Sequence, residues 1–258
     1  MNSEQGFRDY INYAEDDRWA KLYSEYQGRY RDQPRYSDLE SARLVVRALH
    51  EMALGRPARI LDIGCSTGNF LRVLSSAVPN AELVGGDLME NAIQECRADA
   101  ALSGIDFEVM DIFDLPPGGF DTVVANAVTY FFEPDEYCRA ITALGNALRP
   151  GGFLVSFEFV FPDDREQRIV EVSEGHPMGL KFWLRSEAKV RAALSEAGFT
   201  WFDVLPFNVP VDLPIGMVDG PDPELRTRTV INPDTGFREQ FRGDLYQPWV
   251  HLLARKAL

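Results

Sequence analysis

The stretch Arg59–Phe70, RILDIGCSTGNF, decides the fold that this sequence predicts. Its first half is a short, branched apolar run of the kind that forms a buried strand, and the run ends at Gly64. Apolar residues then recur at helical spacing as far as Pro79. The order of strand, glycine loop and helix predicts a βαβ unit with a ligand loop at its centre.

The loop also predicts the chemistry of that ligand. Gly64 and Gly68 permit a positive φ and a close approach of the backbone, while the following helix offers unpaired N–H groups and a positive dipole end. We therefore expect a polar or anionic ligand. Glycine loops also occur in proteins that bind other nucleotides or nothing, and the dinucleotide fingerprint G-x-G-x-x-G would need a glycine where this chain has Asn69.

Polar side chains end several of the predicted strands. Asp62 precedes the loop, and Asp87, Asp111 and Asn126 end the apolar runs that follow it. Strands that alternate with helices form a parallel sheet, whose ligand lies at the carboxyl ends of the strands. We expect these four side chains to meet at one edge of the sheet.

The spacing D-x-G-x-S-x-G over residues 62–68 resembles the first motif of the class I S-adenosylmethionine-dependent methyltransferases, D/E-x-G-x-G-x-G, with Ser66 in place of the middle glycine. The segments FDTVVAN at 120–126 and LRPGGFL at 148–154 are similar to later motifs of that family and follow in the same order. The resemblance implies an α/β fold. Its sheet would be Rossmann-like and doubly wound, with seven strands, mostly parallel, and an antiparallel last strand.

The same resemblance implies S-adenosyl-L-methionine as cofactor and transfer of its methyl group to a nucleophile by in-line displacement. Asp87 would bind the ribose hydroxyls and Asp111 the adenine amino group, with apolar neighbours beside the ring. The cofactor-binding residues expected on this basis are Asp62, Gly64, Cys65, Ser66, Gly68, Asn69, Asp87, Leu88, Asp111, Ile112 and Asn126.

Two further parts of the chain flank this core. Residues 1–56 are expected to form an N-terminal helical lid, with Ser37 or Asp38 as the cap of its last helix. Residues 57–258 would form the methyltransferase domain, with inserts at about 162–183 and 208–245. We expect an exposed loop around residues 174–179 in the first insert and a hairpin turn at Val230–Phe237 in the second.

Candidate residues for catalysis and acceptor binding lie mainly in the lid and the first insert. His176 is the first candidate for a general base because imidazole titrates near neutrality, with Glu158 and Tyr130 as further candidates; each could instead be structural. A turn before the last helix of the lid combines arginine forks with aromatic rings, which suits an anionic small molecule or sugar acid, although surface arginines are often merely solvated. Its candidate acceptor-binding residues are Tyr30, Arg31, Arg35 and Tyr36.

The composition of the chain limits which binding partners and sites can be expected. A formal net charge of −14 disfavours nucleic acid, so we expect a small-molecule or saccharide acceptor, methylated on oxygen. No His/Asp/Glu cluster at ligand spacing predicts a metal site, and the 3 widely spaced cysteines do not suggest a disulfide framework. Without a signal sequence or membrane-length apolar run, the sequence predicts a cytoplasmic protein. Its oligomeric state stays open.

Two other functions remain possible at this point. A nicotinamide-dependent oxidoreductase shares the strand, the glycine loop and the ribose acid, but it should carry the G-x-G-x-x-G spacing that is absent here. A catalytically silent S-adenosylmethionine-binding protein that acts through its inserts would have the same sequence features as the enzyme. Binding of reduced nicotinamide cofactor would identify the first, and binding without turnover the second.

Overall fold

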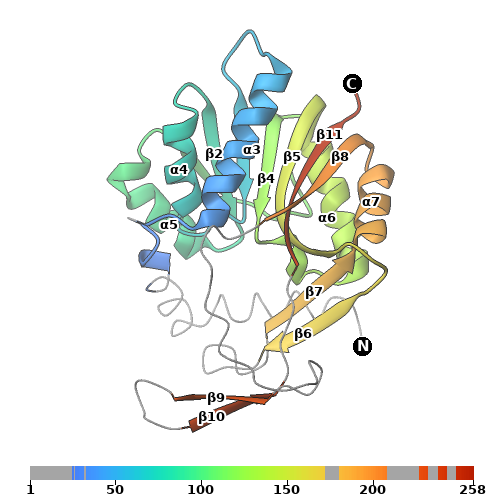
Figure 1. Cartoon of the computed structure of the whole chain (residues 1–258). Coiled ribbons are helices and arrows are strands. Elements are labelled where there is room, and N and C mark those ends of the chain that lie inside the picture. The colour runs from blue at the N-terminus through green and yellow to red at the C-terminus, as the bar shows by residue number, and fades with distance from the viewer. Residues whose placement is uncertain are drawn as a thin grey trace. The chain divides into compact units, whose positions relative to one another are not determined.

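The computed structural model describes residues 25, 27–31, 33–171, 180–207, 227–231, 238–242 and 248–258. The chain divides into two compact units, one of residues Met1–Phe207 and Pro248–Leu258 and the other of residues Asn208–Gln247. Each unit is considered by itself. The first contains the main sheet and all of the described helices (Figure 1).

The sheet of the first unit has the strand order β3-β2-β1-β4-β5-β11-β8. Its parallel part consists of β1 (Arg59–Ile63), β2 (Glu82–Asp87), β3 (Asp106–Val109), β4 (Phe120–Asn126) and β5 (Leu148–Phe161). The strand β11 (Trp249–Lys256) is antiparallel to both β5 and β8 (Phe199–Pro206). This arrangement confirms the expected doubly wound, mostly parallel sheet with an antiparallel last strand.

Helices cover both faces of this sheet (Figure 1). One face packs against α3 (Tyr36–Met52), α4 (Asn69–Ala77) and α5 (Glu90–Ala98), and the other against α6 (Pro134–Ala147) and α7 (Glu187–Glu196). Two short 3₁₀ turns, η1 (Ala100–Leu102) and η2 (Thr129–Phe131), follow α5 and β4. None of the described helices is long and apolar enough to cross a membrane.

The beginning of α3 corrects one expectation. The helix starts at Tyr36 with Arg35 in the N-cap position and no side-chain capping bond, so neither Ser37 nor Asp38 is its cap. The Asp38 carboxylate is fully buried and bonds to side chains outside the helix backbone instead. Local propensity favoured Asp38 as a helix cap, but its carboxylate accepts hydrogen bonds from Arg35 and Asn126 instead.

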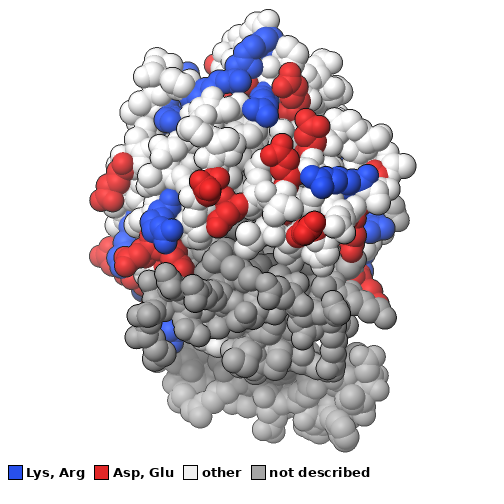
Figure 2. All heavy atoms as spheres, turned by 180° about the vertical axis from the view of Figure 1, so that it is seen from behind, with Lys and Arg blue, Asp and Glu red and all other residues white. Residues whose placement is uncertain are grey.

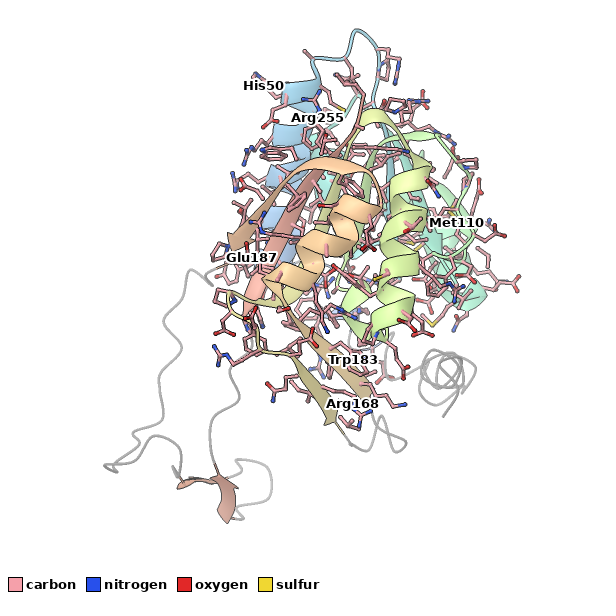
Figure 3. The ribbon with its side chains drawn as sticks, turned by 90° about the vertical axis from the view of Figure 1, so that its right-hand side faces the viewer. His50, Met110, Arg168, Trp183, Glu187 and Arg255 are labelled. Atoms are coloured by element: carbon pink, nitrogen blue, oxygen red, sulfur yellow. The ribbon has the colours of Figure 1, made fainter. Side chains whose placement is uncertain are left out.

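The first insert contains strands that the sequence interpretation missed. β6 (Gln167–Glu171) pairs in antiparallel fashion with β7 (Leu180–Ser186), and β7 joins the end of β5 through Val160↔Arg185 and Phe161↔Ser186. Figure 3 shows Arg168 and Trp183 on this hairpin, at the opposite end of the sheet from His50 and Arg255. The residues between the two strands, including His176, lie outside the described part of the chain.

The second unit contains a two-stranded antiparallel sheet formed by β9 (Thr227–Ile231) and β10 (Arg238–Arg242). Ile231 pairs with Arg238, so the chain reverses between them. This pairing confirms the hairpin expected at residues 230–237.

Charge on the first unit is mixed. On the face seen in Figure 2, several Lys and Arg side chains gather at the top of the described part, and Lys, Arg, Asp and Glu side chains are interspersed over the rest of it. That nucleic acid is disfavoured as a partner stays a prediction from the net charge.

Candidate cofactor and acceptor site

The four polar strand ends predicted from the sequence share one edge of the sheet. Asp62 on β1 lies in register with Gly85 of β2 and with Val124 of β4, and Asp87 pairs with Val109 at the end of β3. Asp111 follows β3, and Asn126 ends β4. Because these strands are parallel, all four residues lie at their carboxyl ends, where doubly wound sheets bind ligands.

At Gly64 the glycine loop lies too close to its neighbour for a side chain. Gly64 has a φ of 78°, and a Cβ placed on it would lie 2.4 Å from Cγ2 of Val128. The loop is held to β2 because the N–H groups of Gly64 and Cys65 both donate to the carbonyl of Gly86, at 2.7 and 3.0 Å. Ser66, the departure from the family pattern, has a φ of 50°, a conformation that costs free energy for any residue but glycine.

Asp87 shapes this loop directly. Its carboxylate accepts hydrogen bonds from the N–H of Ser66 at 2.8 Å and from the N–H of Met89 at 2.9 Å. Burial raises the pKa of Asp87, and these hydrogen bonds only partly oppose that shift. Contact with a ribose stays a prediction, and the structure adds a second role, since Asp87 fixes the backbone of the loop.

The carboxylate of Asp62 is left incomplete. Its side chain is 2% exposed, and no group in the described part of the chain donates a hydrogen bond to Oδ2. Burial, and then the negative charges of Asp38 and Asp87, raise the pKa of Asp62 well above its ordinary value, while Arg35 acts in the opposite direction. A buried carboxylate in this situation either keeps a proton or binds a cation.

A polar cluster on α3, which the sequence interpretation missed, connects this edge to the last strand. We call Arg35, Asp38, Ser41, Asn126 and His251 the α3 polar cluster. Asp38 accepts from Arg35 Nε and from Asn126 Nδ2, both at 2.9 Å, and Asn126 Oδ1 accepts from Ser41 Oγ at 3.1 Å. Ser41 Oγ also lies 2.9 Å from His251 Nε2. Asn126, predicted to bind cofactor, thus has both ends of its amide engaged by α3.

The other predicted cofactor residues lie around the loop. Asn69 begins α4 and donates to the backbone carbonyl of Gln27 at 2.9 Å, so the segment before α3 contacts the loop. Asp111 accepts from the N–H of Phe113 at 2.9 Å. Hydrogen bonding with Cys96 and burial raise the pKa of the Cys65 thiol, which favours a packing role over a nucleophilic one. Gly68 has a φ of 75°, Ile112 is buried and Leu88 is exposed.

The predicted acceptor-binding turn is only partly available for an anion. The guanidinium of Arg35 pairs with Asp38 at 2.9 Å and lies over the ring of Tyr30, 5.4 Å from its centroid. Arg31 and Tyr36 are exposed. Because the charge of Arg35 is already neutralised by a buried carboxylate, this residue has less attraction for an anionic acceptor than the sequence suggested.

Two of the three catalytic candidates can be placed. Glu158 is 1% exposed and accepts hydrogen bonds from the hydroxyl groups of Thr129 and of Ser156, the latter at 3.0 Å. Burial raises the pKa of Glu158, and the charge of Arg185 opposes the shift. Tyr130 lies in η2, mostly buried among aromatic rings. His176 is outside the described residues, and among those described no group of three or more His, Cys, Asp or Glu side chains could hold a metal ion.

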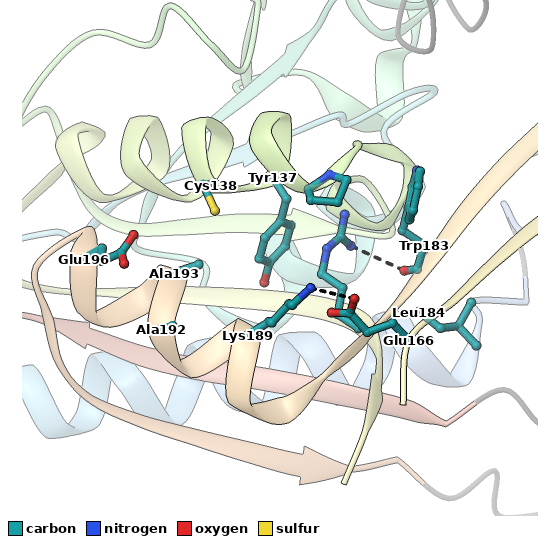
Figure 4. A pocket seen from close by; sticks show the side chains of 11 residues that line it. Tyr137, Cys138, Glu166, Trp183, Leu184, Lys189, Ala192, Ala193 and Glu196 are labelled. Atoms are coloured by element: carbon teal, nitrogen blue, oxygen red, sulfur yellow. Dashed lines mark hydrogen bonds and ion pairs between the residues drawn. The ribbon is translucent and has the colours of Figure 1, made fainter. Parts of the chain in front are cut away.

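A cavity of about 160 Å³ lies between α6, β7 and α7, away from the glycine loop (Figure 4). At its inner wall the buried guanidinium of Arg185 lies 4.0 Å from the centroid of the Tyr137 ring and donates to the carbonyls of Phe132 and Trp183. Lys189 and Glu166 form an ion pair of 2.6 Å among the lining residues. Arg185 therefore fixes the β6–β7 hairpin to the segment between η2 and α6.

Residues 60–152 match the family model described as a methyltransferase domain. Carboxy-S-adenosyl-L-methionine synthase of Campylobacter concisus is 29% identical over 145 residues, which cover 55% of this chain and 62% of that protein. Trans-aconitate 2-methyltransferase of Methylobacterium nodulans is 29% identical over 168 residues, which cover 64% of this chain and 61% of that protein. The matched part of the chain spans about three fifths of the length of these curated relatives.

Solved structures agree on the fold. Magnesium protoporphyrin IX methyltransferase from Synechocystis PCC 6803, solved with bound S-adenosylmethionine, has a TM-score of 0.58 at 16% identity and covers 100% of this chain and 98% of its own. The 1,6-didemethyltoxoflavin-N1-methyltransferase of Burkholderia thailandensis has a TM-score of 0.52 at 20% identity, and the match covers 93% of this chain and 88% of that protein. The fold is that of a class I methyltransferase. Within it, the segment 60–152 is similar to methyltransferase domains.

The residues of the edge fit the cofactor of this family. S-adenosylmethionine carries an ammonium group, which suits Asp62 Oδ2, a buried acceptor without a donor among the described residues. The carboxylate of S-adenosylmethionine suits the N-terminus of α4, directly after Gly68, because the first N–H groups of a helix have no partner within the helix.

Proposed function

We propose that this protein is an S-adenosylmethionine-dependent methyltransferase whose acceptor is a small molecule methylated on oxygen. The observation that carries the proposal is the pairing of a glycine loop, which turns through a positive φ at Gly64 and Gly68, with the incomplete, buried carboxylate of Asp62 beside it. The match of residues 60–152 to a methyltransferase domain, and relatives whose names include trans-aconitate and didemethyltoxoflavin, support a small organic acceptor.

Four groups of the chain would hold the cofactor. Asp62 would bind the ammonium group, the α4 N-terminus the carboxylate, Asp87 the ribose hydroxyls and Asp111 the adenine amino group. When bound, S-adenosylmethionine would supply a methyl group attached to a positively charged sulfur. The acceptor oxygen forms the new bond to the methyl carbon, and the sulfur keeps the electron pair of the bond that breaks. The chain then contributes chiefly alignment of the acceptor and exclusion of water.

An oxygen acceptor also has to lose its proton. Glu158 is already engaged by Thr129 and Ser156 below η2, which supports a positioning role for it over proton transfer. We therefore keep His176 as the candidate base. His176→Ala is expected to lower turnover roughly 100-fold or more while cofactor affinity stays within about twofold. Near-normal turnover with an unchanged pH profile would remove His176 from the mechanism.

The activity itself is tested by transfer of isotope-labelled methyl from S-adenosylmethionine into small-molecule extracts, with the product identified by mass. Labelled product supports the proposal. Tight cofactor binding with no labelled product in any extract would favour the catalytically silent alternative. Binding of reduced nicotinamide cofactor, with none of S-adenosylmethionine, would favour an oxidoreductase.

An anionic acceptor or sugar acid bound by the turn before α3 remains a separate proposal. Arg31→Ala and Arg35→Ala should then raise the acceptor KM with little change in cofactor affinity, and salt should weaken acceptor binding. If neither salt nor either substitution changes acceptor binding, these arginines do not bind the acceptor.

A further inference from the structure

A group of aromatic side chains lies at the same edge of the sheet as the glycine loop. We call the following residues the aromatic cluster: Tyr130, Phe131, Phe157, Phe159, Phe182, Phe207 and Trp249. They come from η2, from the end of β5, from β7, from the residue after β8 and from the start of β11. Since β11 runs antiparallel to β5, its first residue pairs with Phe159 at this edge.

The rings of the cluster contact one another in an unbroken series, in which Tyr130, Phe157 and Phe159 are buried and the other rings are partly exposed. Tyr130 contacts Phe159 with ring centroids 4.6 Å apart, and Phe159 contacts Phe157 at 6.0 Å. Phe157 in turn contacts Trp249 at 5.7 Å, and Trp249 is parallel to Phe207 within 2°. Trp249 is 37% exposed, and the rings of Phe131, Phe182 and Phe207 are half-buried. Partly exposed aromatic rings that gather in this way are typical of binding surfaces.

This surface is continuous with the proposed cofactor site. The turn after β4 passes through Ala127, whose φ is 62°, and Val128, which lies against the glycine loop at Gly64. Ala127 packs against the aromatic cluster, and Tyr130 follows within the next turn. A strained turn therefore links the loop that would hold the cofactor to the rings of the cluster.

Charged groups near this surface are already compensated within the protein. Arg165 lies over the Phe161 ring at 4.8 Å and pairs with Asp163 at 2.7 Å. Glu158 alternates with Phe157 and Phe159 along β5, so its side chain is on the opposite face of the sheet. An ionic acceptor would gain little from these groups, whereas a flat apolar ring would gain from stacking.

We propose that the acceptor of this protein is an uncharged, planar aromatic compound that stacks on the aromatic cluster. This inference rests on the proposed function, because it places the acceptor next to the cofactor loop. The methyl group would go to a hydroxyl substituent of that ring, whose proton passes to the candidate base or to water.

The test measures binding separately from turnover. Full-length protein is saturated with S-adenosylhomocysteine, whose own affinity is first measured by calorimetry. Three probes are then titrated with ligand-observed NMR: 2-naphthol as the planar uncharged compound, 2-naphthoate as its anionic counterpart, and methyl glucoside as a sugar. We expect 2-naphthol to bind at least tenfold more tightly than either of the other probes.

Variants assign the binding to the cluster. Phe159→Leu and Trp249→Leu should each weaken 2-naphthol at least fivefold and leave S-adenosylhomocysteine affinity within about twofold. Trp201→Leu is the matched control, because Trp201 has a similar exposure, 39% against 37%, but pairs with Arg255 on β11, far along the strand from Trp249. It should change neither affinity.

The outcomes separate the two proposals. If S-adenosylhomocysteine does not bind, the proposed function fails. If it binds but 2-naphthoate or methyl glucoside binds as well as 2-naphthol, or if both cluster variants bind 2-naphthol like the wild type, the aromatic acceptor is wrong while the proposed function stands.

Discussion

Replacing Asp62 by asparagine tests whether a buried, incomplete carboxylate recognises the cofactor. In the free protein Asp62 Oδ2 has no hydrogen-bond donor, and burial, Asp38 and Asp87 raise its pKa, with only Arg35 opposing them. A cationic ligand would reverse this balance. We therefore expect S-adenosylmethionine to displace a proton from Asp62 when it binds at a pH below the raised pKa of that carboxyl group.

The magnitude follows from the interactions that are lost. A hydrogen bond between charged groups contributes about 1.5–3 kcal/mol, so Asp62→Asn should weaken binding roughly 10- to 150-fold. In the wild type, affinity should rise with pH by up to about tenfold per unit until Asp62 is ionised in the free protein, and then level off. Asp62→Asn should abolish this part of the pH dependence.

The stability of the free protein should change with pH in the opposite direction to its cofactor affinity. Because the folded-state pKa of Asp62 is raised, its contribution to stability is present at low pH and is lost as the pH rises through that pKa. The unfolding free energy of Asp62→Asn should therefore increase relative to the wild type as the pH rises. Urea unfolding at several pH values measures this difference.

Calorimetry in two buffers of different ionisation enthalpy counts the protons released on binding. At a pH where Asp62 is protonated in the free protein, we expect proton release with S-adenosylmethionine and S-adenosylhomocysteine, and none with methylthioadenosine, which lacks the ammonium group. No proton release with any of the three ligands, together with unchanged affinity in Asp62→Asn, would refute the reasoning.

Three further substitutions test the surrounding framework. Burial lowers the pKa of His251 to about 4, so wild-type stability should fall relative to His251→Gln, by at most about 3 kcal/mol, as the pH drops below 6.5 in urea unfolding. Burial alone would raise the pKa of Asp121, but hydrogen bonds from Arg56, the Arg59 N–H and Arg149 lower it to about 2. Asp121→Asn should thus cost about 1.5–3 kcal/mol at pH 7, and the loss should shrink below pH 4. Ser66→Gly removes a strained φ and a buried, unpaired hydroxyl, so it should raise the unfolding free energy by up to about 1 kcal/mol in the same assay; a loss would contradict the strain argument.

The parts of the fold that the sequence predicted correctly are those that local patterns specify. Apolar runs ending in glycine or an acid located β1 and β2, the resemblance of residues 120–126 to a family motif located β4, and helical spacing of apolar residues located α4. The strand ends at Asp62, Asp87 and Asn126 followed from parallel topology, because such a sheet brings its carboxyl ends together whatever the loops do.

The parts that it missed depend on contacts between distant segments. Asp38 bonds to Asn126, 88 residues away, and no local pattern distinguishes that carboxylate from a helix cap. The strands β6 and β7 are stabilised by pairing with each other and with the end of β5, so their short sequences resembled an irregular insert. Arg35 looked like a free anion-binding group until its partner on α3 was known.

The central claim is that S-adenosylmethionine binds at the glycine loop, and calorimetry of two alanine variants tests it most directly. Gly64→Ala places a methyl group at a φ of 78°, 2.4 Å from Val128, whereas Gly55→Ala adds one where no atom lies within 4 Å. We predict that the wild type and Gly55→Ala bind S-adenosylmethionine equally well, one molecule per chain. Gly64→Ala, assayed below its melting temperature, should bind roughly 5- to 150-fold more weakly, about 1–3 kcal/mol of binding free energy, because the loop has to shift away from Val128 and out of the geometry that would hold the cofactor. Equal affinity of all three proteins, or no binding by the wild type, would contradict the account.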